Sequence, residues 1–258
     1  MKGKHKYSSI LVAFLAVIVI VILLIYVRKP GKEIKPRPAA KPRIAIVLDD
    51  WGYNLNNLHI IEEIRYPLTL AVLPNLSYSK RVSQELYQRG FEIILHLPME
   101  PKEKYRLEKN TILTSMSEAE IINIIAKDLA NIRYAKGVSN HMGSMSTSDT
   151  KTMKIVFAEF KKRHLYFLDS FVTARSSCPL LAYRMGLSFA KRDVFLDNSD
   201  NPGYIKQQVY KLKAKAKSRG FAIGIGHDRK STLQVLKKVI PELEKEGYKF
   251  VFVSDLIK

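Results

Sequence analysis

The segment RIAIVLDD, residues 43–50, decides the fold of this chain because an apolar run ends there in two adjacent carboxylates. Such a run predicts a buried strand of a parallel sheet, which carries the following residues to the carboxyl edge where α/β proteins place their chemistry. Asp49 and Asp50 repel each other at that edge, so we expect a metal, a basic group or water to compensate them. Capping of the following helix is the simpler alternative, although one aspartate would suffice for it.

Strand and helix patterns alternate from Arg43 to the end of the chain. β-rich runs predict strands at 44–48, 68–73, 92–97, 137–140, 165–168, 187–190, 221–225 and 250–253. Amphipathic stretches predict helices at 55–64, 79–89, 117–135, 149–163, 178–185, 201–219 and 231–246. A capping-box start at Ser117 and glycines at 90, 220 and 247 mark helix ends. The alternation predicts an α/β fold with a parallel sheet wound into a closed or nearly closed barrel.

The N-terminal part of the chain has a different composition. A short basic tail, 1–7, precedes an uncharged run of 20 residues at 8–27, which is long enough as a helix to cross a membrane. No small-residue cleavage site follows the run, which favours an uncleaved anchor over a signal peptide. Basic residues flank the run on both sides, so the positive-inside rule does not fix its orientation. We expect a single-pass membrane protein with its large C-terminal domain on the extracytoplasmic side.

Residues 28–42 are rich in proline, lysine and arginine, and we interpret them as a semi-stiff tether to a domain at 43–258. The net charge of +19 lies partly in this region, because residues 1–43 hold ten Lys or Arg and one Glu. No nucleic-acid reading module is recognisable, so we expect no nucleic-acid partner. The single cysteine, Cys178, excludes an intrachain disulfide and a cysteine-based zinc site.

Residues that bind metals or carry protons follow several predicted strands. Besides the aspartate pair, these positions hold His96, His141, Asp169 with Ser170, and His227. The carboxyl ends of parallel strands meet at one rim, so we expect these side chains to converge there. Neutral imidazole and carboxylate are suitable ligands for zinc or another divalent first-row metal.

The chain from about Arg43 onward resembles the divergent polysaccharide deacetylases, a branch of the NodB-like carbohydrate esterase superfamily. The resemblance rests on five stretches in order, which are 48–53 (LDDWGY), 95–100 (LHLPME), 137–144 (GVSNHMGS), 192–197 (RDVFLD) and 226–227 (GH). It implies a distorted (β/α)7-type, TIM-like barrel with a metal at its C-terminal rim. It also implies a hydrolase that removes N-acetyl groups from a polysaccharide, with peptidoglycan as a candidate substrate.

The resemblance implies a role for each matched residue. Asp49 would be the catalytic base and His227 the catalytic acid. Asp50, His96 and His141 would hold a divalent metal, with zinc favoured. The better-known enzymes of the superfamily carry a second histidine four residues after the first, where this chain has Glu100. We expect His141 to replace it and keep Glu100 as a reserve ligand.

Four further residues are predicted to contact substrate. Trp51 and Tyr53 lie beside the expected metal, and aromatic rings stack on sugars, although packing under a loop explains them equally well. Asp169 and Ser170 fall near a motif that lines the substrate groove in the family, and Arg175 is a weak match to its arginine. Two alternatives to a deacetylase stay open: a glycan-binding scaffold without turnover, and a metal-dependent hydrolase of another bond such as a phosphate ester.

Overall fold

The computed structural model describes residues 4–27 and 41–257, and the chain divides into two units, Met1–Ala39 and Ala40–Lys258. The first unit holds helix α1, Lys4–Val27. Within the described residues, no helix is both long and apolar enough to cross a membrane, so the anchor expected at 8–27 is not supported by the structure. Most of the tether expected at 28–42 lies outside the described residues.

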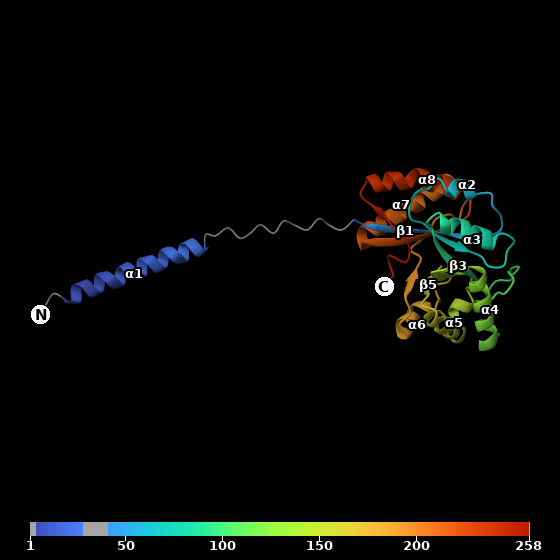
Figure 1. The fold of residues 1–258 in the computed structure, drawn as a ribbon, viewed down its shortest axis with the longest axis horizontal. Helices are drawn as coiled ribbons and strands as arrows, with labels where there is room; N and C mark the ends of the chain where they lie inside the picture. Colours follow the sequence, from blue (N-terminus) through green and yellow to red (C-terminus); the bar gives the residue numbers. More distant parts are fainter. Residues whose placement is uncertain (1–3, 28–40, 258) are drawn as a thin grey trace. The chain divides into compact units, whose positions relative to one another are not determined.

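The second unit is built on a parallel sheet that curls into a half-barrel (Figure 1). Its strands follow the order β6-β5-β4-β3-β2-β1-β8-β7, and β9 pairs with β1 off this path. The strands are β1 Arg43–Trp51, β2 Thr69–Val72, β3 Glu92–Met99, β4 Gly137–Met142, β5 Tyr166–Asp169, β6 Phe189–Lys191, β7 Val194–Phe195, β8 Phe221–His227 and β9 Lys249–Phe250. The expected α/β class with a parallel sheet is therefore confirmed.

The sheet departs from the expected barrel because it does not close. Among the described strands, β6 and β7 are the two ends of the strand order and do not pair with each other. Only Arg192 and Asp193 separate them in the chain, whereas parallel neighbours need a crossover of a dozen or more residues. The sequence prediction missed β7, and β9 covers only the start of the strand predicted at 250–253. Both elements are two residues long, which is too short for a periodic signal.

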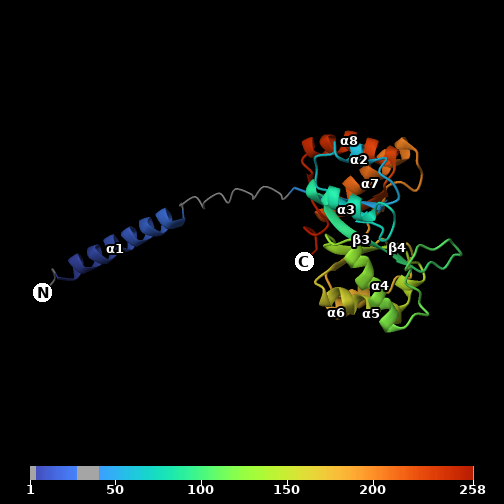
Figure 2. The same cartoon turned by 45° about the vertical axis from the view of Figure 1, so that its right-hand side comes forward.

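Helices surround the outer face of the sheet (Figure 2). Ser117 caps α4 through the predicted capping box, and Gly220 ends α7 with a left-handed φ of 83°. The first helix of the domain is shorter than the 55–64 that the pattern predicted. The helices are α2 Leu58–Ile61, α3 Ser79–Gln88, α4 Glu118–Asn131, α5 Thr150–Lys162, α6 Cys178–Met185, α7 Pro202–Arg219 and α8 Lys230–Lys245, with a 3-10 turn η1 at Ser146–Ser148.

The two faces of the sheet belong to two apolar clusters. In β1, Ile44 and Ile46 pack in the large cluster that includes the helices, whereas Ala45 and Val47 lie in a smaller cluster inside the half-barrel. This separation follows from the alternation of side chains along a strand. Asp49 is the next inward position after Val47, so the interior series of β1 ends in a carboxylate. Among the described residues, the buried apolar side chains all belong to the unit Ala40–Lys258, which therefore has a core of its own.

Candidate metal centre

Strand alternation and pairing bring the predicted residues to the carboxyl edge of the half-barrel interior. His96 lies two residues after the inward Ile94 of β3, and His227 lies two residues after the inward Ile225 of β8. Pairing of β1 with β8 sets Asp49 directly opposite His227. Each side chain thus reaches the rim because its strand is buried, parallel and in register.

β4 supplies two further groups on the same face. Its register with β3 sets Ser139 opposite His96 and His141 opposite Pro98. The Ser139 hydroxyl lies 2.8 Å from His96 Nδ1, which leaves Nε2 of that ring facing the aspartates. His96 is 3% exposed. A histidine whose second nitrogen is held in this way has a fixed ring orientation, as ligating histidines commonly do.

Asp50 reaches the rim by a different route. Regular alternation would turn its side chain away from that of Asp49, toward the helices. Instead, Asp50 has a left-handed φ of 67°, and the pairing of β1 with β2 shifts register between Leu48 and Trp51. Such a bulge re-aims a side chain. Two successive carboxylates therefore face the same cluster.

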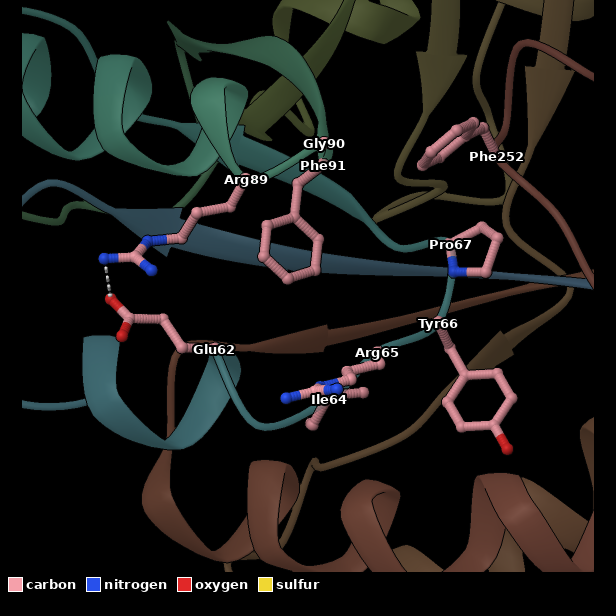
Figure 3. A pocket seen from close by; sticks show the side chains of 9 residues that line it. All are labelled: Glu62, Ile64, Arg65, Tyr66, Pro67, Arg89, Gly90, Phe91 and Phe252. Carbon is pink, nitrogen blue, oxygen red and sulfur yellow. Dashed lines mark ion pairs between the residues drawn. The ribbon is translucent and has the colours of Figure 1, made fainter.

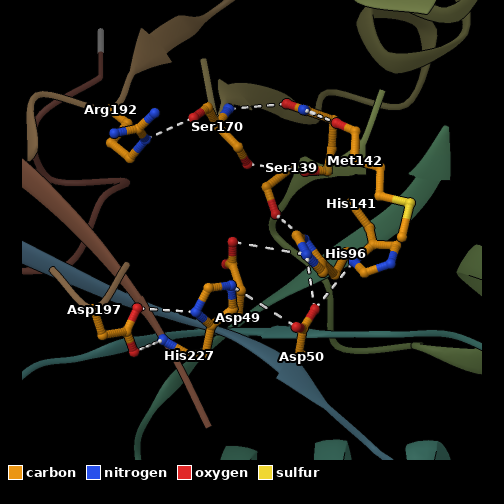
Figure 4. A network of polar contacts seen from close by, with 11 residues as sticks. Asp49, Asp50, His96, Ser139, His141, Met142, Ser170, Arg192, Asp197 and His227 are labelled. Atoms are coloured by element: carbon orange, nitrogen blue, oxygen red, sulfur yellow. Dashed lines mark hydrogen bonds and ion pairs between the residues drawn. The ribbon is translucent and has the colours of Figure 1, made fainter. Parts of the chain in front are cut away.

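Asp50 is the centre of the cluster (Figure 4). Its Oδ1 lies 3.0 Å from His141 Nδ1 and 3.3 Å from His96 Nε2, and its Oδ2 lies 3.9 Å from His227 Nε2. One ligand atom from each of Asp50, His96 and His141 lies within 4.8 Å of the other two. The three residues predicted as the metal triad are therefore brought together.

The protonation states of this cluster suit metal binding. Burial raises the pKa of Asp50, but hydrogen bonds from His141 and His96 outweigh burial and hold it well below its ordinary value. Burial lowers the pKa of His96 to about 4. Near neutral pH, the cluster therefore presents an ionised carboxylate and a neutral His96 ring, which are the forms that bind a cation.

His227 is held by a carboxylate that the sequence prediction gave no role. Asp197 Oδ1 lies 2.9 Å from His227 Nδ1, and its Oδ2 accepts the backbone N–H of His227 at 2.8 Å and the Thr232 hydroxyl at 2.7 Å. Burial raises the pKa of Asp197, but the contacts with His227 and Thr232 outweigh it and lower the value. The pair leaves His227 Nε2 directed toward the aspartates.

Asp49 lies beside His96 and opposite His227, and it is 3% exposed. Its Oδ2 is 3.7 Å from His96 Nε2, and its Oδ1 has no hydrogen-bond partner among the described residues. Burial raises the pKa of Asp49 well above its usual value, and the charges of Asp50 and Asp197 raise it further, against a lowering by Arg192. A nearby cation would favour the ionised form of this carboxyl group.

The residues present fit a divalent cation. The donor set is a carboxylate and two imidazoles, which zinc and other first-row metals prefer. The unpartnered Oδ1 of Asp49 and the close approach of two aspartates are what a cation would compensate. Asp50, His96 and His141 would hold the ion, and Asp49 and His227 would flank it.

Glu100, the reserve ligand, lies elsewhere. Its carboxylate accepts hydrogen bonds from the Thr114 backbone N–H at 2.6 Å and from the Thr114 hydroxyl at 2.7 Å. Its backbone N–H donates to Ser146 Oγ at 3.0 Å. Glu100 therefore fastens the long connection after β3, and it is not part of the cluster.

The two aromatic residues predicted to contact substrate, Trp51 and Tyr53, differ in exposure. Trp51 is fully buried, and its ring offers no face to a sugar in this structure, which favours packing as its role. Tyr53 is 46% exposed, and its hydroxyl donates to Glu108 at 2.6 Å. Only Tyr53 of the two is positioned to contact a ligand.

Asp169 and Ser170 are buried at the end of β5. Asp169 accepts from the Phe171 backbone N–H and the Ser176 hydroxyl, both at 2.7 Å. The Ser170 carbonyl accepts a 2.6 Å hydrogen bond from Arg192 Nε. The two residues therefore shape the turn that positions Arg192, while Arg175 is exposed and outside the cluster.

Three contributors were missed as site residues: Ser139, Asp197 and Arg192. Ser139 stands two residues before His141, so strand alternation was a usable signal for it. Asp197 and Arg192 lie in the quoted stretch 192–197, but it includes the two-residue strand β7, which no periodicity reveals. The partner of Asp197 becomes visible only when β8 is placed beside β7, and those of Arg192, the Ser170 and Phe171 carbonyls, only when β6 is placed beside β5.

A hollow lies at the end of the half-barrel opposite the metal centre (Figure 3). It measures about 490 Å³ and is lined by residues that precede β2 and β3, among them Tyr66 and Phe91, together with Phe252. Glu62 and Arg89 form a 2.8 Å ion pair at its edge. None of the predicted site residues lines this hollow, so the candidate chemistry stays at the carboxyl rim.

The fold and the site together define a class: α/β half-barrel proteins with a candidate Asp–His–His metal centre at the carboxyl ends of their strands. The model of the divergent polysaccharide deacetylase family matches residues 46–257. The chain belongs to this family, as the sequence motifs predicted.

Relatives and solved structures are similar over most of the domain. The uncharacterized protein YibQ of Escherichia coli (strain K12) is 35% identical over 206 residues, which cover 80% of this chain and 65% of that protein. The match thus spans slightly less than two thirds of that relative. The crystal structure of the uncharacterized protein ATU2773 from Agrobacterium tumefaciens C58 has a TM-score of 0.79 at 25% identity, over 85% of this chain and 91% of that chain.

The solved structure of a deacetylase shares the fold. The catalytic domain of peptidoglycan N-acetylglucosamine deacetylase from Eubacterium rectale ATCC 33656 has a TM-score of 0.53 at 14% identity. The similarity covers 84% of this chain and 90% of that chain. At this identity the likeness concerns the fold alone.

Proposed function

We propose that this protein is a metal-dependent hydrolase that removes N-acetyl groups from a polysaccharide of the cell envelope. One observation carries the proposal: Asp50, His96 and His141 converge within 4.8 Å, and Asp49 and His227 flank them from paired strands. This arrangement combines a candidate metal centre with one group to accept a proton and one to donate it. Family membership supplies the expected bond, an N-acetyl amide.

We propose zinc as the cation, held by Asp50, His96 and His141. When bound, it supplies Lewis-acid polarisation of the acetyl carbonyl. Ser139 keeps the His96 ring in place through its 2.8 Å contact with Nδ1. The ligand geometry therefore depends on pairing between β3 and β4 as well as on the ligands themselves.

In the proposed reaction, Asp49 accepts the proton of the attacking water. Its burial confines this proton within the site, because the carboxylate is 3% exposed. His227 then donates a proton from Nε2 to the departing sugar amine, while its Nδ1 stays bonded to Asp197. Asp197 is a positioning residue, because it acts through the histidine ring.

Acetate release tests the proposal. The unit 40–258 would be stripped of metal and assayed on N-acetylated glycans, including peptidoglycan fragments, with and without added zinc. We expect acetate only in the metal-loaded samples. Glycan binding without acetate would favour the scaffold alternative instead, and release of phosphate without acetate would favour a phosphate esterase.

We also propose peptidoglycan as the substrate and an extracytoplasmic location for the domain. The shared fold of the Eubacterium rectale enzyme supports the first, and the uncharged run at 8–27 supports membrane attachment ahead of an exported domain. Fractionation of cells that express the full chain tests the attachment. Recovery in the membrane fraction, with the domain digested by protease added outside the inner membrane, is the expected result.

A further inference from the structure

We propose that a groove beside the metal centre binds an acidic sugar unit of the substrate, next to the sugar that loses its acetyl group. This inference rests on the proposed function and specifies its substrate class. The groove measures about 450 Å³, a volume within the usual range of ligand sites. It is lined by Tyr53, by Asn75, Leu76 and Ser77 from the β2–α3 connection, and by Arg106, Leu107, Glu108 and Lys109 from the β3–α4 connection.

The groove opens on the rim that carries the metal centre. Tyr53 follows Asp50 by three residues, just after the end of β1. Burial, the contact with Glu108 and the charge of Asp50 raise the Tyr53 pKa, in this order of size. The β3–α4 connection projects from the same edge of the sheet (Figure 2). It is fastened to the β4 end by a 2.8 Å hydrogen bond from the Lys102 backbone N–H to Ser144 Oγ. A glycan bound at the metal centre would therefore run on into the groove.

One buried carboxylate fixes two walls of the groove. Asp128 of α4 is fully buried, and its Oδ1 accepts from Asn75 Nδ2 at 2.6 Å and from Asn110 Nδ2 at 3.4 Å. Both asparagines have a left-handed φ of 61°. The two connections are therefore tied to the same helix, which gives the groove a preformed shape.

The lining suits a sugar that carries a negative charge. Tyr53 and Leu107 are 46% and 42% exposed and offer apolar surface to a sugar ring. The Glu108 carboxylate also lines the groove and accepts the Tyr53 hydroxyl at 2.6 Å, so the lining carries two positive charges and one negative charge. Arg106 and Lys109 form no ion pair with any described residue. Two unpaired cations beside an apolar surface favour a carboxylate on the neighbouring sugar.

Calorimetric binding to the metal-loaded unit 40–258 tests the groove. The first probe is a peptidoglycan oligosaccharide whose alternate sugars carry a lactyl carboxylate, and the second is the same oligosaccharide with these carboxylates converted to methyl amides. We expect the first probe to bind about fivefold more tightly, since two exposed cations contribute modestly. The variant Arg106→Ala/Lys109→Ala should lose this preference, and added salt should weaken it.

Lys104→Ala is the matched control, because Lys104 is exposed on the same connection but does not line the groove. It should keep the preference. Equal affinity of the wild type for the two probes, or an unchanged preference in the double variant, overturns the inference. Acetate release from a neutral chitin oligosaccharide tests the proposed function separately. Selective binding without acetate release supports the groove and contradicts the reaction, whereas acetate release without selectivity contradicts the groove alone.

Discussion

The two ends of the half-barrel each hold a carboxylate within a polar network, but the partners of the two carboxylates differ. At the amino end, Glu92 is 4% exposed and accepts from the hydroxyls of Thr69 at 2.8 Å and Tyr166 at 3.0 Å. At the carboxyl end, Asp50 lies against two imidazoles. Hydroxyl groups only donate to the first carboxylate, whereas imidazoles both donate protons and bind metals.

The contrast separates a structural polar network from a candidate chemical one. The Glu92 network fastens the C-terminal segment, since Ser254 donates its backbone N–H to Glu92 at 3.3 Å and Val253 donates to Thr69 Oγ1 at 3.1 Å. The Asp50 cluster links only strands that backbone pairing within the sheet already holds together. Buried ionisable groups with no task in holding the fold are candidates for function.

The largest expected effect comes from the metal ligands. His96→Ala and His141→Ala should each lower zinc affinity and acetate release by more than about a hundredfold, since even the loss of a group that hydrogen-bonds to a ligand costs up to that much. Metal content after purification and acetate release are the measurements. Full zinc occupancy in both variants would contradict the ligand assignment.

Asp49→Asn should lower acetate release by about a hundredfold or more while zinc stays bound, because an amide cannot accept the proton of the attacking water. The measurement is kcat together with metal content in the same sample. Loss of zinc in this variant would show that Asp49 is a ligand and not the base.

Asp197→Asn should reduce acetate release about tenfold to a hundredfold, because His227 loses the carboxylate that orients its ring. Zinc content should not change. Urea unfolding of the variant checks that it still folds, and a lower kcat at an unchanged KM separates positioning of the acid from a loss of substrate binding. An unchanged kcat would argue against this role.

Tyr166→Phe probes the amino end. It should lower the free energy of unfolding by about 1 kcal/mol through the loss of one hydrogen bond to Glu92, with no effect on zinc affinity or acetate release. Urea unfolding and metal titration of the same preparation give both quantities. A change in zinc affinity would mean that the two ends are coupled.

A further prediction concerns the pH dependence of stability. Burial raises the pKa of Asp128 to about 6, against the hydrogen bonds from Asn75 and Asn110. The pKa of Asp128 is higher in the folded state than its unfolded value of 3.8. Its protonation therefore contributes fully to the free energy of unfolding below pH 3.8, and this contribution is lost as pH rises through about 6. Between about pH 4 and about pH 7, the free energy of unfolding should therefore fall less in Asp128→Asn than in the wild type. Urea unfolding at several pH values measures both. An equal loss would contradict the assigned environment.

The sequence predicted which residues meet at the carboxyl rim, but not the side-chain contacts that hold them there. Asp49, His96, His141 and His227 were placed together because parallel strands deliver their last residues to one edge, a rule that needs no side-chain geometry. The partner of His227 was not predicted, because Asp197 lies just beyond a strand of two residues. The burial of Trp51 and the different task of Glu100 depend on how loops fold back, which local patterns do not encode.

The sequence left open whether the sheet closes, since it predicted a closed or nearly closed barrel. Seven repeats of strand and helix suggest closure, but the two residues between β6 and β7 forbid these strands from pairing with each other in parallel. β7 instead pairs with β8, which is what brings Asp197 to His227. The irregular connection therefore completes the site.

The left-handed backbone of Asp50 sets stability and function against each other at a single position. A glycine there would relax the φ of 67°, since glycine adopts this conformation without steric penalty. The same replacement would delete the central carboxylate of the cluster. Selection for a more robust fold and selection for a working centre thus act in opposite directions on residue 50, and a lineage that no longer needed the centre would be free to give up this aspartate first.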